Sequence, residues 1–345
     1  MIGPGPDLAR VGGRRIRMRP PGRRRRVRML AVAACLVAVT TACSSAADKG
    51  DFALIGDSGG GDSGNAESVT LIQQPWVDLQ VENEISKQIL EQLGYSVKVN
   101  EVSVELGAQA MSTGDADAYL GNWWPSQEPT FGDLIKKGDV VVDSTILEGT
   151  EYAPAVPGDT AQKLGIKSLA DLAAHGDEFG RRIYGIEPGS PGNETIQKAI
   201  DSDAYGLGDW KLVASGTPAM LTQVEKDQKA GQPIVFLGWS PHWMTVQFKA
   251  TFLEDPDKVW GGAGTIRTIS RKGWAADNPD IATFLKNLTF STDEAGQFYY
   301  DHDKGSKSLE AIAKAWISAN PDKVAQFLKG VKASDGQDAE SVIGK

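Results

Sequence analysis

The sequence predicts an α/β protein built from two lobes, with a ligand cleft between them. Short apolar runs alternate with segments whose apolar residues recur every three or four positions, which is the pattern of strands followed by helices. A strand-like run that leads into glycine, tryptophan and proline occurs twice, at Leu120–Pro125 and at Leu237–Trp243. Because ligands bind at the carboxyl ends of strands in open α/β sheets, the two phrases predict two edges that offer tryptophan to one shared cleft.

The first lobe is predicted to begin as a doubly wound unit. A buried-type strand at Val69–Ile72 is followed by Pro75–Asp78 at its carboxyl end. Asp78 could cap the helix that comes next, because its short carboxylate can accept the first backbone N–H groups. Two further strands, near 95–99 and 116–120, flank a short helix, and the second strand leads into the first tryptophan phrase.

The second lobe is predicted to begin where this pattern changes. Residues Val140–Pro157 read as short strand-like pieces that cross between the lobes, with Tyr152 among them. Further on, the turn-rich loop Glu187–Asn193 opens a helix, whose first backbone N–H groups suit a carboxylate or a hydroxyl oxygen. A plain strand-to-helix turn is the alternative for this loop. The strand before the second tryptophan phrase completes the lobe.

The amino-terminal part reads as a targeting segment. Residues Arg14–Arg28 are basic and Met29–Val39 are apolar but too few to span a bilayer stably, which predicts a secretory signal. The following Thr40–Ser45 resembles a bacterial lipobox, in which Cys43 would be lipidated and become the first mature residue. An ordinary cleaved signal with a free terminal cysteine is the alternative. The predicted organisation is a signal at 1–42, a flexible tether at 43–67, lobe I at 68–148 and 257–345, and lobe II at 149–256.

Charge and motif content exclude several classes of function. The net charge is −9, but residues 1–42 hold ten Arg, no Lys and one Asp, so the remainder carries −18 and is a poor nucleic-acid binder. Metal-ligand spacings and a phosphate-binding loop are missing from the sequence, and we expect no metal and no cofactor. Ser58 stands in a Gly-Asp-Ser-Gly phrase typical of serine proteases, but the low-complexity tether gives it no rigid scaffold for a catalytic triad.

Tryptophan at a cleft suits one kind of ligand particularly well. A quaternary ammonium ion has no N–H to donate, so hydrogen bonds cannot hold it, whereas each aromatic face contributes about 1 to 2 kcal/mol when desolvated. Three or four such faces would support micromolar capture once the polar end of the ligand is also satisfied. The chain has nine Trp, enough for such a box in addition to its core.

Four phrases together resemble one family, the substrate-binding proteins of quaternary-amine ABC importers that bind glycine betaine or choline. The phrases are Pro75–Asp78, Leu120–Pro125, Tyr184–Gly189 and Phe236–Met244. The resemblance covers about Ser68 to Gly330 and implies a type II periplasmic-binding-protein (Venus-flytrap) fold. It also implies that Trp76, Trp123 and Trp239 form the walls of an aromatic box, with Tyr152 as the fourth.

The resemblance further implies contacts for the polar end of the ligand. Asp78 matches the acidic residue that faces the ligand in choline binders, and Ser190 stands where such binders usually have Asn. For a ligand carboxylate, the candidates are Gly192, Asn193 and His242. Asp78 favours a ligand with a hydroxyl donor, while the helix start and His242 favour one with a carboxylate, so betaine and choline both remain open.

The expected function is therefore capture of glycine betaine or a relative, with choline as the nearest alternative. The protein is expected to be a monomer without enzymatic activity, exported and anchored to the outer face of the cell membrane by lipid on Cys43. Its expected partners are the small ligand and the permease of an ABC transporter with its cytoplasmic ATPase. A secreted serine hydrolase and an envelope lipoprotein without a transport role are the competing classes.

Overall fold

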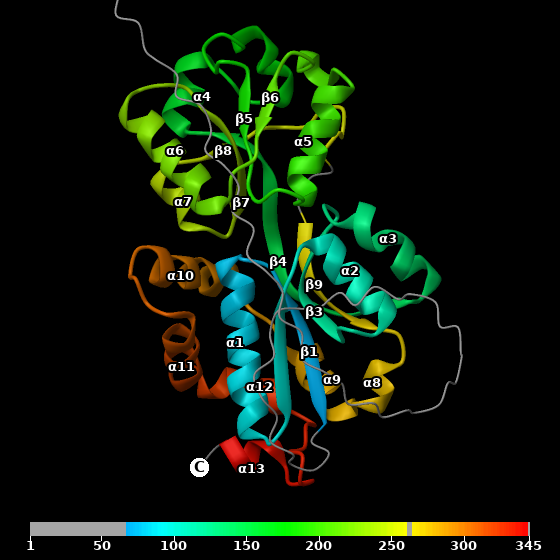
Figure 1. Ribbon diagram of the computed structural model, residues 1–345. Coiled ribbons are helices and arrows are strands. Elements are labelled where there is room, and N and C mark those ends of the chain that lie inside the picture. Colours follow the sequence, from blue (N-terminus) through cyan, green and yellow to red (C-terminus); the bar gives the residue numbers. More distant parts are fainter. Residues whose placement is uncertain (1–66, 261–263, 344–345) are drawn as a thin grey trace, which may run out of the picture. The chain divides into compact units, whose positions relative to one another are not determined.

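The computed structural model describes residues 67–260 and 264–343 (Figure 1). The predicted signal, the tether up to residue 66, Cys43 and Ser58 lie outside the described residues. Among the helices that are described, none has both the length and the apolar character needed to cross a bilayer.

Nine strands are described, and they form one continuous sheet. They are β1 Ser68–Gln73, β2 Ser96–Glu101, β3 Ala118–Trp124, β4 Val140–Val156, β5 Arg182–Tyr184, β6 Lys211–Val213, β7 Val235–Ser240, β8 Thr251–Phe252 and β9 Gly264–Arg271. Their order is β2-β1-β3-β9-β4-β7-β5-β6, and β8 pairs with β4 outside this path. Strands β1, β2 and β3 run parallel, as do β5, β6 and β7, while β9 and β4 are antiparallel to their neighbours.

Strand β4 joins the two halves of the sheet. Its residues up to Thr150 pair with β9, and those from Glu151 onward pair with β7. The expectation of several short pieces is wrong, because β4 is one strand of 17 residues. Irregular register at three points between Val142 and Thr150 interrupts the two-residue alternation, which is why the sequence reads as broken there.

The helices cover the sheet and carry conventional terminal signals. They are α1 Val77–Gln92, α2 Val104–Thr113, α3 Glu128–Lys137, α4 Gly158–Leu164, α5 Pro191–Asp201, α6 Thr217–Lys229, α7 Trp243–Gln247, α8 Trp274–Asp277, α9 Pro279–Asn287, α10 Thr292–Asp303, α11 Leu309–Ala319, α12 Pro321–Leu328 and α13 Ala339–Ile343. Three short 3-10 turns lie at Leu169–Asp171, Ala173–His175 and Ala204–Gly206. Helix α10 begins with a capping box, in which Ser291 and Glu294 satisfy each other's backbone N–H groups.

The element that matters most for the site is α10. It packs against α1 and β4 and also against α7, which follows β7 in the other half of the sheet (Figure 1). Phe298 and Tyr299 of α10 are both 2% exposed, so the helix is fixed by burial of two adjacent aromatic side chains. One short helix therefore contacts α1, which follows Trp76, and α7, which begins at Trp243 of the second tryptophan phrase.

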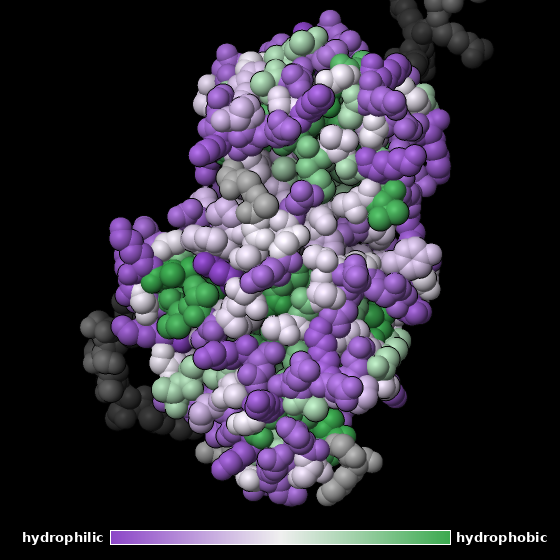
Figure 2. Space-filling view, turned by 180° about the vertical axis from the view of Figure 1, so that it is seen from behind, coloured by the Kyte–Doolittle hydropathy of each residue, from purple (hydrophilic) through white to green (hydrophobic). Residues whose placement is uncertain are grey.

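The surface is largely hydrophilic on the face opposite that of Figure 1, with hydrophobic residues in separate groups (Figure 2). Five large hydrophobic side chains are exposed among the described residues: Leu106, Val141, Val142, Val246 and Tyr300.

Candidate functional site

The two tryptophan phrases end two strands of the sheet. Trp123 and Trp124 are the last residues of β3, and Trp239 is the penultimate residue of β7. In both phrases the following proline, Pro125 or Pro241, has a cis peptide bond. A side chain at Gly121 would lie 2.8 Å from Leu79 and from the ring of Tyr119, so glycine is required for the close packing beneath the first phrase.

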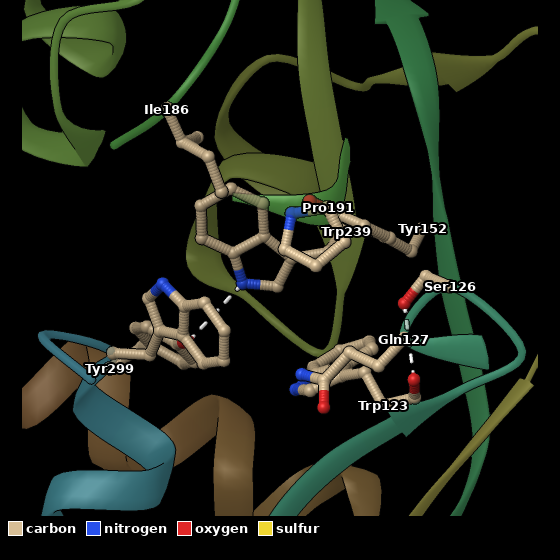
Figure 3. Close-up of a pocket in the computed structure, with 9 residues that line it drawn as sticks. Trp123, Ser126, Gln127, Tyr152, Ile186, Pro191, Trp239 and Tyr299 are labelled. Atoms are coloured by element: carbon tan, nitrogen blue, oxygen red, sulfur yellow. Dashed lines mark hydrogen bonds between the residues drawn. The ribbon is translucent and has the colours of Figure 1, made fainter. Parts of the chain in front are cut away.

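A cavity lies between these strand ends (Figure 3). It contains about 380 Å³ of empty space, part of it open to solvent. Its lining consists of Trp76, Trp123, Ser126, Gln127, Tyr152, Ile186, Pro191, Trp239 and Tyr299. All four predicted box residues are in this set, and the described lining includes no charged side chain.

The aromatic rings of the cavity are held by contacts with one another and with the backbone. Trp123 and Tyr152 have ring centroids 5.7 Å apart, at an interplanar angle of 51°. The indole N–H of Trp260 donates to the carbonyl oxygen of Tyr152, and the two rings meet edge to face at 5.5 Å. These contacts fix the box wall that comes from β4 before any ligand binds.

Tyr299 is a fifth aromatic wall that sequence reasoning missed. It comes from α10 and accepts a hydrogen bond of 3.2 Å from the indole Nε1 of Trp239 (Figure 3). Its own hydroxyl donates to Oδ1 of Asp78 at 2.7 Å. Nothing in the sequence around Tyr299 distinguishes it from the core aromatics of an amphipathic helix, so no local signal could have identified it.

Asp78 lies behind Tyr299 rather than in the cavity. Its side chain is 1% exposed, and it is not among the residues that line the cavity. The expectation that Asp78 is the helix cap is wrong in position, because Trp76 occupies the N-cap of α1 and Asp78 is the second helical residue. Burial raises the pKa of Asp78, while hydrogen bonds from Tyr299 and from the backbone N–H of Leu79 act in the opposite direction.

The start of α5 uses its backbone donors internally. Ser190 is the N-cap, and its hydroxyl accepts from the N–H of Asn193 at 3.4 Å. Pro191 has no N–H, and the N–H of Gly192 bonds to the phenol of Tyr152. The Asn193 side chain bonds to the backbone N–H and carbonyl of Ile186, each at 3.0 Å. Of this segment only Pro191 lines the cavity, together with Ile186 before it.

His242 is also placed outside the cavity lining. Its ring packs against Tyr299 and Trp239, with centroids 4.1 and 5.0 Å apart. Its Nδ1 accepts the backbone N–H of Met244 at 3.0 Å, which makes His242 the cap of α7. Burial, and secondarily the charge of Lys304, lower the pKa of His242 to about 3, so the ring is neutral at neutral pH and supplies no positive charge for a carboxylate.

Two polar residues of the cavity, Ser126 and Gln127, were not expected from the sequence. The amide of Gln127 donates to the hydroxyl of Tyr119 and to the carbonyl of Gly121, both at 3.1 Å. The hydroxyl of Ser126 donates to the carbonyl of Trp123 at 3.2 Å. The hydrogen bonds of both side chains therefore hold the loop after β3 in place. The sequence signal for these two residues was their position alone, since both directly follow the first tryptophan phrase.

The site has the chemistry of a neutral aromatic receptor. Within residues 67–260 and 264–343, no group of three or more His, Cys, Asp or Glu is arranged to hold a metal ion. The cavity offers aromatic faces, phenol oxygens and apolar edges, with one buried carboxylate behind a wall. Such a site attracts a cation without donating hydrogen bonds to it.

Comparison with known proteins places the chain in a family. Residues 67–319 match the family model described as the substrate binding domain of the ABC-type glycine betaine transport system. The glycine betaine/carnitine transport binding protein GbuC of Listeria monocytogenes is 37% identical over 163 residues, which are 47% of this chain and 54%, about half, of that protein.

Two solved structures extend the similarity. An ABC-transporter choline binding protein in complex with choline is 34% identical, with a TM-score of 0.77 over 80% of this chain and 96% of the other. Lactococcal OpuAC in its closed form with glycine betaine is 27% identical, with a TM-score of 0.68 over 76% of this chain and 99% of the other. The predicted two-lobed α/β fold of periplasmic binding proteins is thereby confirmed.

Proposed function

Because this chain belongs to the family of substrate-binding domains of ABC-type glycine betaine transport systems, we propose that it captures a small quaternary ammonium compound and delivers it to an ABC permease. The single observation that carries the proposal is the cavity wall, which contains five aromatic side chains and, among its described residues, no charged one. At about 1 to 2 kcal/mol for each desolvated face, these rings are sufficient to hold a trimethylammonium group. The ligand, the permease and its ATPase are the proposed partners.

The polar end of the ligand distinguishes two candidates. Glycine betaine carries a carboxylate, which needs hydrogen-bond donors. The N–H groups of Gly192 and Asn193 are already bonded to Tyr152 and Ser190, and His242 is neutral. Choline carries a hydroxyl and no negative charge, so it needs none of these donors. None of the donors expected from the sequence is therefore available for a carboxylate, which supports choline over glycine betaine, although betaine was the first expectation from the sequence.

Isothermal titration of the purified protein with choline, and separately with glycine betaine, tests the proposal. We expect micromolar binding of at least one ligand, and a loss of about 100-fold in Trp123→Ala and in Trp239→Ala, since each loses a cation-π face and its packing. Trp124→Ala is the matched control, because Trp124 adjoins the box without lining it. Binding of neither ligand, or full affinity in both box variants, would overturn the proposal.

The competing class of serine hydrolase has a direct test. The family is one of transport binding proteins and not an enzyme class. A fluorophosphonate probe should leave the protein unlabelled, and labelling that Ser58→Ala abolishes would support the hydrolase.

Members of the family are extracytoplasmic, and we propose that this chain is held at the membrane by lipid on Cys43. Metabolic labelling with a radioactive fatty acid should mark the protein, and Cys43→Ser should remove both the label and the membrane association.

A monomeric state and the lobe boundaries at 148/149 and 256/257 stay predictions. The change of strand partner within β4, after Thr150, supports placing the first boundary in this strand.

A further inference from the structure

The hydroxyl of Tyr299 is at the centre of a short chain of hydrogen bonds. The indole Nε1 of Trp239 lies 3.2 Å from it, and Oδ1 of Asp78 lies 2.7 Å from it. An indole nitrogen can only donate, and the phenol hydroxyl donates to Oδ1 of Asp78. The direction of both bonds is therefore fixed, from Trp239 to Tyr299 to Asp78.

This direction decides what Tyr299 can offer a ligand. The single proton of the phenol is directed to Asp78, and one of its two acceptor positions is used by Trp239. One acceptor position remains, and Tyr299 lines the cavity. Burial and the charge of Asp78 raise the pKa of Tyr299 well above its ordinary value, so the phenol keeps its proton and remains the donor to Asp78.

We propose that Tyr299 is the residue that selects the polar end of the ligand, because its hydroxyl accepts a hydrogen bond from a ligand hydroxyl and repels a ligand carboxylate. Asp78 acts through Tyr299 as a positioning residue, without touching the ligand. This inference rests on the proposed function and deepens it, since it explains how one aromatic box distinguishes a hydroxylated cation from a zwitterion of similar size.

The proposal differs from the expectation based on family resemblance. That expectation made Asp78 a direct ligand contact, whereas here the carboxylate is covered by the phenol and is 1% exposed. Trp239 therefore has two roles. Its ring offers a cation-π surface to the ligand, and its N–H orients the hydroxyl of Tyr299. The aromatic wall and the polar selector are thus parts of one hydrogen-bonded unit.

Four ligands of graded chemistry test this. They are choline, choline methyl ether, tetramethylammonium and glycine betaine, titrated into the purified full chain. The ether has the cation and the oxygen of choline but no hydroxyl proton, so it should bind the wild type about 10-fold more weakly than choline, the usual effect of one lost hydrogen bond. In Tyr299→Phe the affinity of choline should fall to that of the ether, while tetramethylammonium changes by less than about 3-fold.

Ratios of affinities keep the test valid if Tyr299→Phe is partly destabilised, because a general loss affects choline and its ether alike. Tyr300→Phe is the matched control, since Tyr300 is the next residue of α10 and is 53% exposed. Asp78→Asn is the second variant. Its amide can donate to the phenol, which frees the phenol proton for the cavity, and glycine betaine should then gain several-fold relative to choline.

The outcomes separate the two proposals. If the wild type binds none of the four ligands, the proposed function itself fails. If it binds them but the preference for choline over its ether is the same in Tyr299→Phe, or if glycine betaine binds the wild type more tightly than choline, only the selector role of Tyr299 is overturned.

Discussion

The indole of Trp243 donates a hydrogen bond of 2.7 Å to Oδ2 of Asp303. This contact repeats the pairing of Trp239 with Tyr299, because both partners are displaced by four residues, one helical turn on α10. The ammonium of Lys304 lies 3.6 Å from the ring centroid of Trp243 and adds a cation-π contact. The carboxyl end of α10 is thus bonded to the second tryptophan phrase twice, once at the cavity through Trp239 and once outside it through Trp243.

A double-mutant cycle on Trp243 and Asp303 should reveal this junction. Trp243→Phe keeps a ring beside Lys304 but removes the N–H, and Asp303→Asn removes the charge of the acceptor. Each should reduce the free energy of unfolding by about 1 kcal/mol, and the double variant should lose less than the sum because both changes act on the same hydrogen bond. Urea unfolding measures all three. Val246→Ala, at an 81% exposed position of α7, is the control, and strict additivity would show that the bond contributes nothing.

Gly192→Ala should weaken ligand binding by displacing a box wall. A Cβ at residue 192 would overlap the phenol of Tyr152 and lie 2.7 Å from Leu237, so the ring has to move. Loss of one cation-π face predicts an affinity about 10-fold lower. Titration with choline checks this against Gly132→Ala, where the nearest atom to the new methyl is the Cγ of Glu128 at 3.2 Å. Unchanged affinity in Gly192→Ala would mean that Tyr152 does not need its present position.

Glu82→Gln should stabilise the protein above neutral pH. Burial, followed by repulsion from Asp78 and Glu294, raises the pKa of Glu82 well above its ordinary value, and Oε1 has no hydrogen-bond partner among the described residues. A raised carboxyl pKa costs stability at high pH, and this cost disappears as pH falls toward the ordinary value of 4.5. Glutamine should therefore gain about 1 kcal/mol at pH 8 and less at pH 5 in urea titrations. A gain that grows on acidification would contradict the assignment.

His242→Asn should make stability less dependent on pH. The folded-state pKa of about 3 lies below the ordinary 6.5, so the unfolded chain binds the proton first and stability is lost as pH falls from about 6.5 toward 3. Between pH 7 and pH 5 the imidazole accounts for a loss of about 2 kcal/mol. Asparagine can still cap α7 but does not titrate. The measurement is the difference between the urea midpoints of the two proteins at both pH values, and parallel curves would refute the burial of a neutral imidazole.

Much of this site could be predicted from the sequence because its chemistry is local. Trp123 and Trp239 stand beside glycine and proline at the ends of apolar runs, and those neighbours define a strand end wherever they occur. Trp76 also follows a strand, β1, but only the family resemblance implied its place in the box. The structure places all three in one lining.

What the sequence could not predict depends on distant partners. Tyr299 bonds to Asp78 across 221 positions of the sequence, and the residues around either one do not indicate the other as a partner. Its neighbours predict Asp78 as a helix cap and the family resemblance implies a ligand contact, but tertiary contact with α10 determines where its carboxylate lies. The length of β4 was hidden for a related reason, since irregular pairing with β9 removes the alternation that identifies a strand.

Strand β4 makes one residue common to the cavity and to the joint of the sheet. It changes hydrogen-bonding partner between Thr150 and Glu151, and Tyr152 follows immediately. The backbone of Tyr152 pairs with Trp239 of β7, while its ring lies 5.7 Å from the ring of Trp123 of β3. The residue beside the junction of the two halves of the sheet is therefore also the residue that connects the cavity walls contributed by both halves.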